Sequence, residues 1–150
     1  MEGLSVMYQT ILLPTDGSPG SELAVDHALD LARRYDATLH LLYVVDTDIV
    51  NHYAGIDAIE GVEHALQSHG ADALEAAAAR ATDEGVPVEQ HVVEGSPHEA
   101  ILDAIPMVGA DLVVMGTERR SDEYHRLVGS VTERVVRTAD VPVHVVKAAV

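Results

Sequence analysis

The sequence has 150 residues, of which 47% are hydrophobic, and its 25 acidic and nine basic residues give a formal net charge of −16. This length is most simply one domain spanning residues 1–150, with residues 1–6 either a disordered extension or a segment ahead of the true start. The absence of cysteine excludes disulfides, thiol catalysis and cysteine-ligated metals, and the negative charge argues against nucleic acid and anionic membranes as partners.

The N-terminus and the apolar stretches carry no targeting signal. The first residues include an acid at position 2 and no basic region, so they do not resemble a signal peptide. No apolar run approaches the roughly 18 residues of a membrane span. We therefore expect a cytoplasmic protein. The acid excess with a single lysine, Lys147, indicates adaptation to high salt, the alternative being an ordinary acidic protein.

Short apolar runs of strand length alternate with helical patterns along the chain. In chain order, strands are expected at residues 10–13, 39–45, 88–93, 112–115 and 143–146, and helices at residues 24–35, 60–84, 100–108 and 132–138. Near-continuous apolar character is typical of strands buried on both faces of a parallel sheet. The alternation predicts an α/β fold, an open five-stranded parallel sheet with four helices in three layers.

Several helix starts are marked by local residue chemistry. Two strands are followed by an acid, a glycine, a serine and a proline, at residues 16–19 and 94–97, which predicts a helix with proline in its first position. Ser96 with Glu99, and Ser130 with Glu133, have the spacing of a capping box. The polar segment 46–61 is expected to form a loop over the carboxyl edge of the sheet.

Three segments that end at this edge carry candidate ligand-binding residues. They are Pro14-Thr15-Asp16, Tyr43 to Asp46, and the loop from Gly116 to Ser130. In open α/β sheets, ligands bind beyond the carboxyl ends of the strands, where the strand order reverses. Glycines followed by a helix start allow backbone N–H groups to approach an anion closely. The last segment therefore has the pattern of a phosphate site.

The chain resembles the universal stress protein family from about residue 8 to residue 147. The resemblance is carried by ILLPTDGS at 11–18, LLYVVD at 41–46, GSPHEAI at 95–101, VVMGT at 113–117 and GSVTERVVRTADVPVHVV at 129–146. It implies strand order 3-2-1-4-5, a homodimer and ATP binding with magnesium. By the same resemblance, the nucleotide-binding residues are Pro14, Thr15, Asp16, Val44, Met115, Gly116, Gly129, Ser130 and Val131. Arg119, which stands at a glycine position of the family motif, is a further candidate in the same loop.

One residue departs from the family pattern of Gly-x-x-Gly, nine residues, then Gly-Ser or Gly-Thr. The spacing from Gly116 to Gly129-Ser130 is intact, but Arg119 stands at the second glycine. Arginine does not allow the positive φ and close approach that glycine permits. Losing one phosphate hydrogen bond costs about 1–3 kcal/mol, roughly 5- to 150-fold in affinity. Alternatively, the guanidinium of Arg119 binds a phosphate directly.

Structural roles compete with ligand roles at these positions. Gly116 and Gly129 can serve turn geometry alone, and Ser130 can simply cap its helix. Asp16 can be a turn residue. Among the nine histidines, His64 and His69 are five apart rather than four, and the others are scattered along the sequence. We therefore predict no metal site.

These observations predict a cytoplasmic, dimeric, nucleotide-responsive module of the stress response. The alternative is a family member that no longer binds ATP and acts as a dimeric protein-interaction module. Enzymatic activity is at most a slow ATPase, because no general base other than Asp16 is expected at the site. The dimer is expected through the last strand, with Val141, Val143 and Val145 in the interface, since exposed apolar edge strands tend to be paired.

Overall fold

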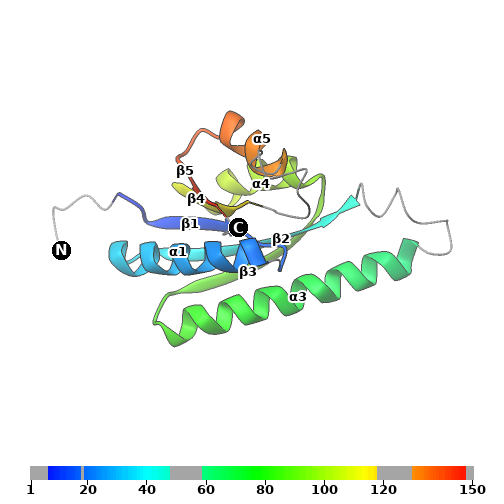
Figure 1. The fold of residues 1–150 in the computed structure, drawn as a ribbon, viewed down its shortest axis with the longest axis horizontal. Coiled ribbons are helices and arrows are strands. Elements are labelled where there is room, and N and C mark those ends of the chain that lie inside the picture. The colour runs from blue at the N-terminus through cyan, green and yellow to red at the C-terminus, as the bar shows by residue number, and fades with distance from the viewer. Residues whose placement is uncertain (1–6, 18, 48–58, 118–129, 148–150) are drawn as a thin grey trace.

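The computed structural model describes residues 7–17, 19–47, 59–117 and 130–147, and these residues form one parallel sheet covered by helices on both faces (Figure 1). The strands are β1 (Thr10–Pro14), β2 (Thr38–Asp46), β3 (Val88–Gly95), β4 (Leu112–Gly116) and β5 (Val143–Val146). Their order across the sheet is β3-β2-β1-β4-β5, and every pairing is parallel. The predicted fold class and the predicted strand order 3-2-1-4-5 are both confirmed.

The helices divide between the two faces of the sheet (Figure 1). They are α1 (Pro19–Tyr35), α3 (Ile59–Asp83), α4 (Pro97–Val108) and α5 (Ser130–Thr138). Helices α1 and α3 pack on one face and α4 and α5 on the other, each pair over its own cluster of buried side chains. None of the described helices is both long and apolar enough to cross a membrane.

The central strand β1 shows why the sheet is buried on both faces. Ile11, Leu12 and Leu13 are all fully buried, with Ile11 and Leu13 in the α1/α3 core and Leu12 in the α4/α5 core. Alternate side chains of a strand point to opposite faces, so a continuous apolar run fills both cores. Strand β3 lies at one edge of the sheet, and its side chains are exposed or half-buried.

Helix α4 begins where the sequence predicts, but one expected contact is wrong. Ser96 is the N-cap in an extended conformation (φ −76°, ψ 128°), and Pro97 follows it in the first turn. The Ser96 side chain makes no capping hydrogen bond, so the capping box expected with Glu99 does not form. Proline at this position is already fixed at a helical φ and lacks one N–H that would need a partner, so it favours a helix start here without the side-chain cap.

Candidate functional site

The carboxyl end of β1 places three predicted site residues at the edge of the sheet. Pro14 ends the strand, and Thr15 is buried with its backbone N–H donating to the Leu42 carbonyl at 2.8 Å. The Gly17 N–H donates to Thr15 Oγ1 at 3.3 Å. The segment thus continues alongside β2 before it turns toward α1.

Asp16 is held in a tight turn by its own side chain. Its carboxylate accepts a hydrogen bond from Ser21 Oγ at 2.6 Å, and its backbone N–H donates to the same hydroxyl oxygen at 3.2 Å. Gly17 has φ +78°, and a Cβ there would lie 3.0 Å from His69 Nε2, so glycine is required. Asp16 therefore acts as a turn residue, which was the structural alternative to its predicted role in ligand binding. The residue as a whole is exposed, so a contact with a ligand remains sterically open.

The carboxyl end of β4 lies under the first turn of α5. Met115 is buried, and the Gly116 carbonyl accepts a hydrogen bond from Thr132 Oγ1 at 3.1 Å. Ser130 is the exposed first residue of α5, and Val131 packs against the α4/α5 core. The structure thus brings the end of β4 and the start of α5 together, as the phosphate-site hypothesis requires.

Thr132 lies at the predicted site, and sequence reasoning missed it. It is buried, and its hydroxyl is the described link between α5 and the Gly116 carbonyl. The sequence feature that could have revealed it is a hydroxyl side chain in the first turn of the helix that follows β4. Two other predicted residues, Arg119 and Gly129, lie outside the described residues.

Val44 lies on the neighbouring strand, on the face that carries α4 and α5. It is half-buried against the α4/α5 core, and its register partner on β3 is Val93. Thr15, Val44 and Gly116 come from the carboxyl halves or ends of β1, β2 and β4, which are neighbours in the sheet. The described part of the predicted site is therefore continuous across three strands.

Two carboxylates near the carboxyl end of β2, those of Asp16 and Asp46, place negative charge close to Tyr43. Burial raises the pKa of Tyr43, and the nearby negative charges of Asp16 and Asp46 raise it further. A phosphate would be repelled by the same carboxylates unless a cation accompanied it. Among the predicted components, Mg²⁺ and the guanidinium of Arg119 are the groups that could supply that positive charge.

A cavity of about 430 Å³ lies on the opposite face, between α1 and α3. It shares Thr15 and Gly17 with the β1 end, and its other lining residues come from the two helices: Glu22, Val25, His69, Asp72, Ala73, Ala76, Ala77 and Arg80. No pattern in the sequence predicts this cavity. Of the predicted nucleotide residues that the structure describes, Thr15 lines the cavity, whereas Val44 and Val131 pack on the α4/α5 face.

Two histidines that appear scattered in the sequence are neighbours in the fold. His40 Nδ1 lies 2.9 Å from His91 Nε2, and His40 Nε2 lies 3.9 Å from Glu89 Oε2. Burial lowers the pKa of His40, while the negative charge of Glu89 opposes that shift. These residues lie toward the amino ends of β2 and β3, away from the nucleotide edge.

Comparison with known proteins gives a consistent result over the whole described chain. Residues 7–147 match the family model described as the universal stress protein family. Universal stress protein MJ0531 of Methanocaldococcus jannaschii is 37% identical over 145 residues, which cover 94% of this chain and 83% of that protein.

Two solved structures share the fold at comparable identity. The chain is similar to protein MJ0577 of the same organism, with a TM-score of 0.86, 30% identity and coverage of 96% of this chain and 99% of that one. It is also similar to a universal stress protein solved in complex with cAMP, with a TM-score of 0.70, 29% identity and coverage of 95% and 99%.

Proposed function

The chain belongs to the universal stress protein family, and we propose that it is an adenine-nucleotide-binding module whose ligand is ATP with Mg²⁺. The structural relative that binds cAMP supports the adenine nucleotide as the ligand class. The observation that carries the proposal is the junction between Gly116 and the first turn of α5, which Thr132 fixes with a 3.1 Å hydrogen bond. A helix start placed beside a strand-ending glycine favours a bound phosphate.

Each described residue of the site has a role in this proposal. Thr15, Asp16 and Val44 line the adenine and ribose end, beside Pro14. Met115 and Gly116 form the floor at the end of β4. Ser130 and Val131 offer backbone N–H groups at the start of α5. Gly129 and Arg119, which lie outside the described residues, complete the phosphate end.

Calorimetry with Mg-ATP at high potassium chloride tests the proposal directly. We expect binding by the wild type and a change of 5- to 150-fold in affinity on Arg119→Gly, the size of one phosphate hydrogen bond. A gain means that glycine restores close approach, and a loss means that the guanidinium binds phosphate. The neighbouring substitution Arg120→Gly is the matched control, because it removes the same charge outside the motif position.

Absence of binding in both the wild type and Arg119→Gly, with folding confirmed by circular dichroism, would contradict nucleotide binding. The departure at Arg119 from the family motif favours one second candidate, a protein-interaction module without nucleotide. Hydrolysis of ATP is tested separately, by measuring the release of phosphate. A slow ATPase predicts Mg-dependent phosphate release that Asp16→Ala abolishes.

The proposed assembly is a homodimer through β5. This strand is an edge of the described sheet, because it pairs with β4 alone. Val143 packs against the α4/α5 core, as does Val141, and Val145 is half-buried without being part of that core. Val145→Glu is therefore the cleaner probe of the interface, since it spares the core.

Light scattering of Val145→Glu should give a monomer mass where the wild type gives a dimer. Val92→Glu is the matched control, because Val92 is 46% exposed on β3, the opposite edge strand. A dimer that survives Val145→Glu unchanged would place the interface elsewhere.

A further inference from the structure

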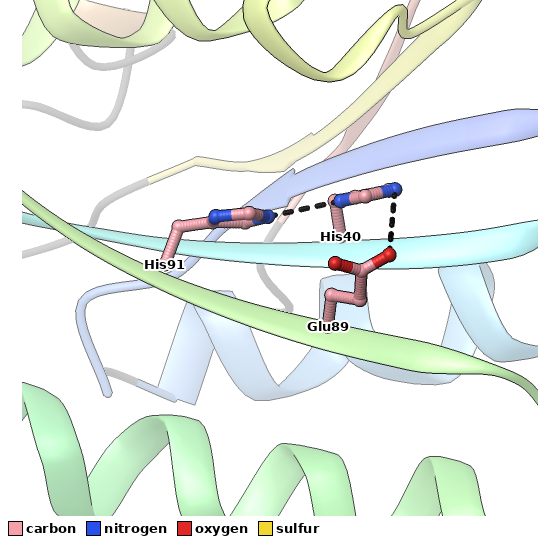
Figure 2. A group of neighbouring side chains, drawn as sticks. All are labelled: His40, Glu89 and His91. Carbon is pink, nitrogen blue, oxygen red and sulfur yellow. Dashed lines mark hydrogen bonds and ion pairs between the residues drawn. The ribbon is translucent and has the colours of Figure 1, made fainter.

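His40, Glu89 and His91 are brought together by the register of β2 and β3 (Figure 2). The strands pair in parallel, with His40 opposite Glu89 and Leu42 opposite His91. Alternate residues of a strand share a face, so the three side chains project on the same side of the sheet as Leu42, which belongs to the α4/α5 core. Three residues that are far apart in the sequence thus form one cluster.

The cluster has the dimensions of a metal site. Taking one ligand atom from each residue, the three atoms lie within 4.8 Å of one another. His40 Nδ1 and His91 Nε2 face each other at 2.9 Å, with the two ring planes within 13°. Two imidazole nitrogens on a tetrahedral zinc ion lie about 3.4 Å apart. To admit the ion, the half-buried ring of His91 would move about half an ångström away from His40, and the two rings would turn so that both nitrogen lone pairs point at the ion instead of at each other.

The three side chains differ in their exposure to solvent. The His40 side chain is only 10% exposed, His91 is half-buried, and the Glu89 side chain is 63% exposed. The imidazole of His40 is thus fixed by packing, while the carboxylate of Glu89 is free to adjust its position. An ion has access from the Glu89 side, where water can complete its coordination.

We propose that His40, Glu89 and His91 bind a divalent transition-metal ion, with zinc as the best match. Two imidazoles and one carboxylate are the ligand types of open zinc sites, in which water holds the fourth position. Mg²⁺ and Ca²⁺ prefer oxygen ligands alone, so the two imidazoles select against them. The net charge of −16 concentrates cations near the protein.

A bound ion would join the edge strand β3 to β2 by side chains as well as by backbone hydrogen bonds. In the described sheet, β3 pairs only with β2. The expected consequence is stabilisation of the fold by the ion, because a ligand that binds the folded state shifts the unfolding equilibrium. At free zinc about 100 times the dissociation constant, the melting temperature should rise by roughly 5–10 °C.

The test is a zinc chloride titration of the full chain, produced without a histidine tag, stripped with a chelator and kept free of nucleotide. Calorimetry should show one high-affinity equivalent, and Co²⁺ should give the visible absorption of a tetrahedral complex. Glu89→Gln and His91→Gln should each weaken zinc binding at least tenfold, since even outer-shell changes cost 10- to 100-fold. Both positions are accessible enough for the variants to fold, which circular dichroism checks.

His27→Gln is the matched control. His27 Nδ1 lies 3.4 Å from His144 Nε2, so this is a second imidazole pair, and it is not part of a three-ligand group within the described ranges. We expect zinc affinity in His27→Gln to stay within twofold of the wild type. The proposal is overturned if folded wild-type protein shows no high-affinity equivalent. It is equally overturned if Glu89→Gln and His91→Gln bind zinc as tightly as His27→Gln does.

Discussion

Strand β2 carries a different candidate site at each end. Near its amino end, His40 faces His91 and Glu89 on β3, whereas near its carboxyl end Val44 lies on the strand next to β1, with β4 one strand further across the sheet. The first cluster consists of side chains on two regular strands. The second depends on backbone N–H groups, a glycine and a helix start.

The difference shows two ways in which one sheet can place a binding group. A site at the carboxyl edge is assembled by loops, so its chemistry can change with a loop residue such as Arg119 while the strands stay the same. A site on the strand face is assembled by register, so it depends on the pairing of β2 with β3. A substitution can therefore change binding at both ends of β2 together, or at one end alone.

The largest effect is expected at the centre of β2, where the two ends are joined. Leu42 is fully buried in the α4/α5 core between His40 and Val44. Leu42→Ala should lower the free energy of unfolding by about 2–5 kcal/mol, because it leaves a cavity in a packed core. Urea denaturation measures the loss. Val92→Ala on the exposed part of β3 should change stability by less than about 0.5 kcal/mol.

A folded Leu42→Ala variant that loses either zinc binding or Mg-ATP binding, but not both, would sharpen the comparison. It would show that the two ends of β2 respond independently to a change between them. A loss of stability equal to that of Val92→Ala would contradict the packing described for β2.

A smaller effect, confined to the carboxyl half, is expected from Gly70→Ala. A Cβ at Gly70 would lie 2.2 Å from the ring of Tyr43, and an aromatic ring packed in the core cannot give way cheaply. Overpacking costs about 1–3 kcal/mol, and the better helix propensity of alanine offsets up to about 1 kcal/mol. We expect a net destabilisation of about 1–2 kcal/mol by thermal or urea unfolding.

Gly61→Ala is the control for helix propensity. Gly61 lies in the same helix α3, and a Cβ there would meet no atom within 4 Å. It should be neutral or stabilising by up to about 1 kcal/mol. Equal effects at Gly61 and Gly70 would mean that Tyr43 moves freely and does not support this end of the sheet.

The sequence predicts the carboxyl-edge site better than the strand-face cluster, for a physical reason. The end of β1, the end of β4 and the start of α5 are each marked locally, by an apolar run that stops at Pro14 or Gly116 and by Ser130. Parallel topology then brings such ends to one edge without further information.

The cluster of His40 and His91 could not be found by spacing along the chain. The two residues are 51 positions apart, and their contact depends on which residue of β3 faces which residue of β2. Helical i, i+4 spacing is a local signal, whereas register is set by the packing of both strands against the helices. The hydroxyl of Thr132 was missed for a related reason, because its partner is a backbone carbonyl on another element.

Thr132→Val tests the carboxyl end without touching the strand-face cluster. The substitution keeps the shape of the side chain but leaves the Gly116 carbonyl without this hydrogen bond, at a cost of about 1 kcal/mol in stability. Because α5 then loses this hydrogen bond to the end of β4, we expect weaker Mg-ATP binding and unchanged zinc binding. Thr138→Val, at an exposed position in the same helix, should leave both unchanged. A parallel loss of zinc affinity in Thr132→Val would show that the two ends are coupled.

The smallest effect is a pH dependence that arises from Tyr43 at the carboxyl end. Burial, with help from Asp16 and Asp46, raises the pKa of Tyr43 above its ordinary value of 10.0. As the pH rises past 10.0, the unfolded chain loses the tyrosine proton before the folded chain does, so the folded state is progressively disfavoured. The stability difference between the wild type and Tyr43→Phe should therefore be constant below that pH and should shift against the wild type above it. Urea unfolding of the two proteins across this range measures the shift. A difference that stays flat would mean that the Tyr43 hydroxyl is open to water and that the negative charge at this edge does not reach it.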